Sequence, residues 1–166
     1  KLSVAMFWSH PTITEYADFL LSQLQTKPTT QNKTKKERQW FVRVSPNPEA
    51  AQRIFFFHDA GGSTALFASL ANLLKGVVDV VSIELPGRSH RVGEPMYTHV
   101  QELTTDLIAD MSSLLDKPYF LFGHSMGGLL AFELAKTLRD RNMPLPVKMF
   151  VSSTPGLTTY SRREAD

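Results

Sequence analysis

The chain has 166 residues, of which 42% are hydrophobic and 20% are charged, and its formal net charge is +2. This composition excludes a disordered chain, and no apolar run approaches the ~18 residues that a membrane-spanning helix needs. Cysteine is absent, which excludes disulfides, thiolate metal sites and a cysteine nucleophile. There is also no signal-peptide pattern, and we therefore predict a cytoplasmic protein that binds neither a metal nor a membrane.

Residues 1–24 are predicted to form a first unit that ends in an amphipathic helix. Thr12 and Glu15 have the spacing of a capping box, which favours a helix start at this point. A single helix of this length is not stable alone, and the chain begins with Lys1 rather than Met, so we expect a piece of a longer protein. The apolar side chains that repeat at helical spacing are Ile13, Tyr16, Ala17, Leu20 and Leu24.

Residues 25–38 are predicted to be a flexible linker. They hold four Lys and one Arg against one Glu, and they show no apolar periodicity. Local positive charge without an aromatic platform is a poor fit to a nucleic-acid site, so we interpret it as the charge of a solvated segment and predict no nucleic-acid partner.

From Gln39 onward, buried strands alternate with helical segments. Helical periodicity follows the turn at 58–63 and recurs over 100–114 and 126–138. Alternation of this kind predicts an α/β fold, a mainly parallel sheet with helices on both faces. Apolar runs predict strands at 40–44, 53–57, 77–85, 119–122 and 149–151.

The stretch Gly123-His124-Ser125-Met126-Gly127 has the Gly-x-Ser-x-Gly pattern of a nucleophile elbow. A predicted strand ends just before it and a predicted helix begins at Met126, which is the context that the motif requires. Such a turn strains the serine backbone, and Gly123 and Gly127 leave room where a Cβ would collide with a neighbouring strand or helix. The helix dipole favours negative charge near the hydroxyl, so we predict that Ser125 is a catalytic nucleophile.

An oxyanion hole needs two backbone N–H groups aimed at one point. The residue after the nucleophile, here Met126, is expected to supply the first group, and the loop after an early strand the second. The small residues at 58–62 (HDAGG) directly follow the strand predicted at 53–57, where the backbone can approach a substrate closely. A glycine-rich helix start with no ligand remains the alternative for this loop.

The segment from Trp40 to Pro155 resembles the thioesterase domains of polyketide and nonribosomal peptide synthetases, which belong to the α/β-hydrolase superfamily. It looks most like the stand-alone editing kind, called type II. The resemblance implies an α/β-hydrolase-type sheet, truncated before the lid and the last strands. The matching stretches are FFFHDAGGS at 55–63, VVSIELPGRSHRVGEP at 80–95, KPYFLFGHSMGGLLAFELAKTLR at 117–139 and MFVSSTP at 149–155.

The resemblance implies a Ser-His-Asp triad that acts on acyl thioesters. Their acyl groups are held on the phosphopantetheine arm of an acyl or peptidyl carrier protein, and no cofactor is bound directly. Ser125 matches the nucleophile of the family, and Met126 and Ala60 match its oxyanion-hole amides.

Three polar side chains beside these motifs are interpreted differently. His58 matches a position to which we assign no catalytic role. His124 is expected to turn toward the protein and to be structural. Arg88 lies in the Pro-Gly-Arg turn of the family, where a structural role and a substrate-side role both remain open.

Residues 2–24 (LSVAMFWSHPTITEYADFLLSQL) resemble the C-terminal end of an acyl or peptidyl carrier protein, whose last helix begins at such a Pro-Thr-Ile. Ser3 and Ser9 do not match the phosphopantetheine-bearing serine of that family, which lies well upstream. The resemblance implies an incomplete carrier at 1–24, a linker at 25–38 and the N-terminal part of a thioesterase domain at 39–166.

The triad is incomplete in this sequence. Hydrolases of this architecture have the chain order serine, acid, histidine, and no histidine follows Ser125. Glu133 and Asp140 lie in or near the elbow helix, and residues 151–153 (VSS) hold no carboxylate. The triad His and Asp are therefore assigned to no residue of this chain. Some integrated thioesterases carry the acid at the position of residues 151–153, so the resemblance favours the type II arrangement, in mild conflict with a fused carrier.

Several functions stay open at this stage. The leading hypothesis is thioester hydrolysis by Ser125, and the alternatives are acyl transfer or macrocyclisation by the same serine, a non-catalytic carrier-docking module, and an unrelated lipase or esterase. A base at His58, His90 or His99 would need a chain order that the fold does not use. We expect the 166-residue fragment itself to be inactive or nearly so.

Overall fold

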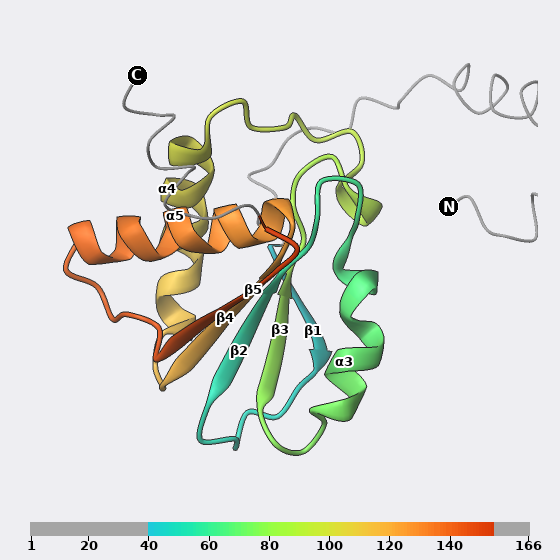
Figure 1. Ribbon diagram of the computed structural model, residues 1–166, viewed down its shortest axis with the longest axis vertical. Helices are drawn as coiled ribbons and strands as arrows, with labels where there is room; N and C mark the ends of the chain where they lie inside the picture. The colour runs from blue at the N-terminus through green and yellow to red at the C-terminus, as the bar shows by residue number, and fades with distance from the viewer. Residues whose placement is uncertain (1–39, 155–166) are drawn as a thin grey trace, which may run out of the picture. The chain divides into compact units, whose positions relative to one another are not determined.

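The computed structural model describes residues 40–154, which form one sheet flanked by helices (Figure 1). The carrier-like unit predicted at 1–24, the linker predicted at 25–38 and the chain after residue 154 lie outside the described residues. Within the described part, no helix is both long enough and apolar enough to cross a membrane.

The described residues form a five-stranded sheet with the strand order β1-β3-β2-β4-β5. Strand β1 runs antiparallel to β3, and every other neighbouring pair is parallel. The predicted mainly parallel sheet is therefore confirmed, with one antiparallel strand at its edge. The strands are β1 (Phe41–Ser45), β2 (Arg53–Phe57), β3 (Asp79–Ile83), β4 (Tyr119–His124) and β5 (Lys148–Ser152).

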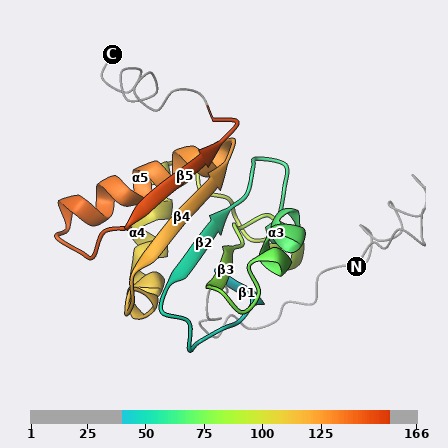
Figure 2. The same cartoon turned by 60° about the horizontal axis from the view of Figure 1, so that its bottom comes forward.

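Helices cover both faces of the sheet, as the alternating pattern predicts. Helix α3 lies on one face, whereas α4 and α5 lie together on the other (Figure 1 and Figure 2). Short 3-10 turns precede α3 and follow β3 and α4. The bounds are η1 (Thr64–Phe67), α3 (Ala68–Leu73), η2 (Ser89–Arg91), α4 (Val100–Met111), η3 (Ser112–Leu114) and α5 (Met126–Asp140).

Strand β2 lies in the middle of the sheet and contributes to two hydrophobic cores. All of its residues are buried, and their side chains alternate between the two faces of the sheet. Phe55 and Phe57 pack with α4 and α5, whereas Ile54 and Phe56 pack with Phe67 on the α3 side. Each fully buried Phe contributes roughly 1.5–3 kcal/mol relative to an exposed one. The uninterrupted apolar run, predicted as a buried strand, thus supplies both cores.

Four of the five strands differ from the predicted bounds by one or two residues at an end, and two of these differences have a clear physical reason. The strand predicted at 77–85 is shorter, because Gly76 turns the chain with a φ of +80° and Val77 is 72% exposed. The strand predicted at 119–122 is longer, because β4 is paired on both sides up to Gly123. The first glycine of the Gly-x-Ser-x-Gly motif is therefore a strand residue, and the turn is confined to the serine.

A buried ion pair joins the amino ends of β2 and β3. Arg53 Nε donates to Asp79 Oδ2 at 2.8 Å, and Arg43 Nη1 and the Asn47 N–H donate to the same carboxylate at 3.2 Å. Burial by itself would raise the pKa of Asp79, but these hydrogen bonds and the two guanidinium charges hold the pKa below its ordinary value. The carboxylate therefore stays ionised and ties three segments together.

Replacing Asp79 with Asn is expected to lower the free energy of unfolding by about 3 kcal/mol at neutral pH, because the buried Arg53 then keeps only the exposed Asp116, at 2.6 Å, as a counter-charge. The wild-type carboxylate stabilises the fold above about pH 3.9, the pKa of an unfolded aspartate, and this contribution is lost as the pH falls through the lower folded-state pKa. Urea denaturation at neutral pH and at about pH 3 measures both effects.

The matched control is Asp140→Asn, since the Asp140 side chain is 62% exposed. It should change stability by less than about 0.5 kcal/mol. Equal losses in the two variants, or an Asp79→Asn loss that persists unchanged at low pH, would contradict the role given to the ion pair.

Candidate active site

Ser125 lies in the tight turn between β4 and α5, with φ 53° and ψ −120°. A non-glycine residue at such a φ is strained, as predicted for the serine of an elbow. The turn is held by its own backbone, since the Ser125 N–H donates to Ser152 O at 2.8 Å. The Ser125 carbonyl accepts from Gly128 N–H and from Thr154 Oγ1, both at 3.0 Å. The hydroxyl makes no capping bond to α5.

Three glycines permit the close packing around this turn. A Cβ at Gly123 would overlap the backbone of Gly127, and a Cβ at Gly127 would overlap the carbonyl oxygens of the β2 end. A Cβ at Gly128 would overlap the side chain of Thr154. The prediction that Gly123 and Gly127 leave room for neighbouring backbone is confirmed. Position 128 also has no room for a Cβ.

The loop after β2 lies at the same edge of the sheet as the elbow. Gly127 of α5 packs against the carbonyl oxygens of Phe57 and His58, so the loop that carries Ala60 begins beside the first turn of the helix. Met126 lies in that turn, at the amino end of a 15-residue helix whose first N–H groups have no partner within the helix. Participation of the Met126 and Ala60 amides in an oxyanion hole stays a prediction.

A buried histidine and a buried glutamate lie behind this loop. His58 and Glu84 are both 0% exposed, and His58 Nε2 lies 3.6 Å from Glu84 Oε1. His58 Nδ1 lies 2.7 Å from Asp59 O, and Thr64 Oγ1 donates to Glu84 Oε2 at 2.9 Å. Glu84 was not predicted as a site residue. The sequence feature that could have indicated Glu84 is its carboxylate inside the apolar run at 77–85.

Other polar groups near the elbow have structural contacts. His124 is half-buried with Nδ1 3.2 Å from Ser152 Oγ, so its side chain turns toward β5 as predicted. Arg88 Nη2 donates to Ala60 O at 2.5 Å, which gives Arg88 a structural role at the loop. Arg88 also borders the cavity described next, so a substrate-side role stays open.

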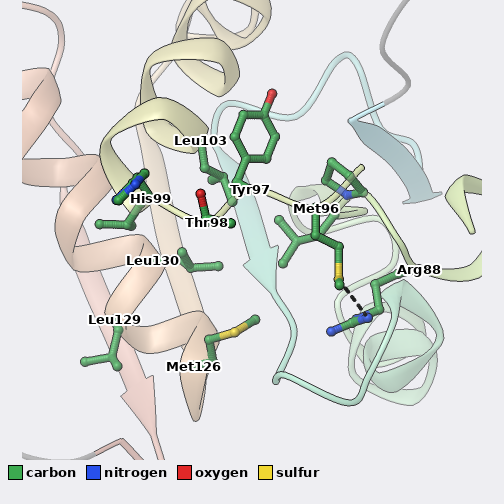
Figure 3. Close-up of a pocket in the computed structure, with 12 residues that line it drawn as sticks. Arg88, Met96, Tyr97, Thr98, His99, Leu103, Met126, Leu129 and Leu130 are labelled. Carbon is green, nitrogen blue, oxygen red and sulfur yellow. Dashed lines mark hydrogen bonds between the residues drawn. The ribbon is translucent and has the colours of Figure 1, made fainter. Parts of the chain in front are cut away.

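A cavity of about 270 Å³ lies beside Met126 (Figure 3). Leu129 and Leu130 of α5 line one side of it, and the segment that includes Met96 and Tyr97 lines the other. Most of the lining side chains are apolar. The volume is near the lower end of ligand pockets, which span roughly 300–1,000 Å³. The cavity was not predicted, because its walls come from segments far apart in the sequence.

Comparison with known proteins identifies related chains. A family model described as "Thioesterase domain" matches residues 52–165. The gramicidin S biosynthesis protein GrsT of Aneurinibacillus migulanus is 36% identical over 113 residues, which cover 68% of this chain and 44% of that protein. The human medium-chain S-acyl fatty acid synthase thioesterase is 34% identical over 124 residues, which cover 74% of this chain and 47% of that protein.

A solved structure shows the same similarity in three dimensions. The type II thioesterase BorB from the borrelidin biosynthetic cluster superposes with a TM-score of 0.64 and 32% sequence identity. The match covers 70% of this chain and 50% of the BorB chain. The expected α/β-hydrolase-type architecture is thereby confirmed, and the chain spans about half the length of the relatives it matches.

Replacing Gly127 with Ala is expected to lower the free energy of unfolding by about 1–3 kcal/mol, because the new methyl group would push α5 away from the carbonyls of Phe57 and His58. Gly61→Ala is the matched control, since nothing lies within 4 Å of a Cβ at that position. Urea denaturation followed by circular dichroism measures both. A Gly127→Ala variant as stable as Gly61→Ala would show that the backbones need not touch.

Proposed function

The chain belongs to the thioesterase domain family, and on that premise we propose that it hydrolyses acyl thioesters through an acyl-enzyme on Ser125. The observation that carries the proposal is the strained backbone of Ser125, with φ 53° at the start of α5. A serine in that conformation at the carboxyl end of a parallel strand is the arrangement of a nucleophile elbow. Family membership alone does not identify a nucleophile, and this geometry supports the choice of residue.

The proposed reaction has two steps. The Ser125 hydroxyl attacks the thioester carbonyl, and the N–H groups of Met126 and Ala60 stabilise the oxyanion, at about 3–4 kcal/mol per donor. The tetrahedral species expels the thiol and leaves the acyl group on the serine. Water then attacks the acyl carbonyl, and the carboxylic acid and the free serine are released. The general base is assigned to no residue of this chain, because no histidine follows Ser125.

We propose that the thiol is the phosphopantetheine of an acyl or peptidyl carrier protein in polyketide or nonribosomal peptide biosynthesis. The proposal is supported by the relatives, since GrsT is named for gramicidin S biosynthesis and BorB for the borrelidin cluster. Acyl transfer or macrocyclisation by the same serine is the second candidate, in which an internal alcohol or amine replaces water. A docking module without turnover is the third.

The cavity beside Met126 supports an apolar acyl group of short to medium length. Its walls offer Leu129, Leu130 and Leu103 rather than charged side chains, apart from Arg88 at the border. Met126 follows Ser125 in the chain and lines this cavity, so we propose that the chain of an acyl group on Ser125 extends into it. Each CH₂ transferred from water to such a cavity contributes about 0.8 kcal/mol.

Ser125→Ala in the full-length protein is expected to lower kcat for hydrolysis of a short-chain acyl thioester by at least about 10³-fold, because the nucleophile is removed. A fluorophosphonate probe should add its mass to the wild type and not to the variant. Ser112→Ala is the control, since Ser112 is exposed at the end of α4 and its hydroxyl bonds only the local Ala109 carbonyl in the described structure.

The products separate the candidate functions. A free carboxylic acid supports hydrolysis, whereas a cyclic product or an ester of an added alcohol supports acyl transfer. Absence of both turnover and probe labelling in the full-length wild type would favour the docking module and contradict the proposal.

Leu129→Phe is expected to shorten the preferred acyl chain, because the larger ring occupies part of the cavity. Relative to wild type, kcat/KM should fall about tenfold for a decanoyl thioester and stay unchanged for an acetyl thioester, since about two CH₂ groups lose their contacts. Leu145→Phe is the control, at a residue that is 52% exposed and does not line the cavity. Equal effects on both chain lengths would contradict the cavity as the acyl site.

A further inference from the structure

The loop between β2 and η1 is held at two consecutive carbonyls. His58 Nδ1 lies 2.7 Å from Asp59 O, and Arg88 Nη2 donates to Ala60 O at 2.5 Å. A carbonyl oxygen can only accept, so His58 Nδ1 carries the proton of the first hydrogen bond. The two contacts lie on either side of Ala60 and fix its backbone. The Ala60 amide is the predicted second donor of the oxyanion hole.

The contact made by His58 acts on the Ala60 amide itself. The Asp59 carbonyl and the Ala60 N–H are the two ends of a single peptide unit. A hydrogen bond to the carbonyl end draws electron density toward the oxygen, which makes the N–H end a stronger donor. His58 therefore affects the Ala60 N–H through the peptide unit, without needing to touch a substrate.

Glu84 lies behind the imidazole and completes the arrangement. Glu84 Oε1 is 3.6 Å from His58 Nε2, and both atoms are buried without a hydrogen-bond partner in the described part of the chain. At 3.6 Å the two atoms face each other just beyond hydrogen-bond distance, and the other ring nitrogen, Nδ1, stays directed at the Asp59 carbonyl. The Thr64 hydroxyl fixes the second oxygen of Glu84 at 2.9 Å, which holds the carboxylate in this position.

We propose that His58 and Glu84 are positioning residues that orient and polarise the Ala60 amide for oxyanion stabilisation. The inference rests on the proposed thioesterase function, in which that amide is a donor. Strands β2 and β3 are joined separately by the ion pair of Arg53 and Asp79 and by the two apolar cores. The specific contacts of His58 and Glu84 are directed at the loop that carries Ala60.

Two substitutions at one position test the proposal in the full-length protein. The amide nitrogen of Asn can replace Nδ1, so His58→Asn retains a donor to Asp59 and should keep kcat within about threefold of wild type. The amide of Gln reaches the position of Nε2 instead, so His58→Gln should lower kcat about tenfold with KM unchanged. Glu84→Gln should also lower kcat, because a carboxamide replaces the carboxyl group that faces the imidazole.

A second measurement reports on the amide directly. In ¹⁵N-labelled protein the Ala60 amide proton resonance should move upfield in His58→Gln and stay near its wild-type position in His58→Asn. Circular dichroism and thermal unfolding identify any variant that does not fold. If a His58 variant does not fold, the effect of Glu84→Gln on kcat tests the proposal instead. Equal kcat in both His58 variants, a change confined to KM, or an unmoved Ala60 resonance in His58→Gln would overturn the proposal.

Failure of this proposal and failure of the proposed function give different results. If Ser125→Ala keeps full turnover, the proposed function is wrong, whatever the His58 variants do. If Ser125→Ala is inactive and the His58 variants match each other, the serine chemistry stands and only the role of His58 and Glu84 is wrong.

Discussion

The first turn of α5 lies so close to the end of β2 that position 127 has no room for a Cβ. Because Gly127 packs directly on the carbonyls of Phe57 and His58, this contact sets the distance between the elbow and the loop that carries Ala60. Two amides that stabilise one oxyanion must converge on a single point, and a small displacement of either weakens the hydrogen bonds. The arrangement of the candidate site therefore depends on this contact between backbones.

The contact between Gly127 and the end of β2 is kept only if β2 and its neighbouring strands are held in place. Strand β2 is packed on both faces, with Phe55 and Phe57 in one core and Phe56 in the other. The ion pair of Arg53 and Asp79 joins β2 and β3 at their amino ends. This charged network lies at the opposite edge of the sheet from Ser125, so the groups that stabilise the sheet are separate from those that would meet a substrate.

The carboxyl edge of the sheet contains two environments with different chemistry. On the α4 and α5 side lies the largely apolar cavity beside Met126. Behind the loop after β2 lie His58 and Glu84, both completely buried. A buried polar group is costly unless it has a partner, and here one atom of each side chain has one: His58 Nδ1 contacts the Asp59 carbonyl, and Glu84 Oε2 accepts from the Thr64 hydroxyl. Ser125 and Met126 belong to the segment that follows β4 at this same edge.

Local patterns in the sequence were sufficient for the strands and helices, for the mainly parallel sheet, and for the strained turn at Ser125 with its glycines. Apolar periodicity and Gly-x-Ser-x-Gly depend on residues that are close in the chain, and such patterns can be read directly. Glu84 beside His58, and the cavity between α5 and the segment at 96–99, depend instead on strand order and register. Only tertiary packing brings those segments together, because no local pattern specifies which side chains meet across parallel strands.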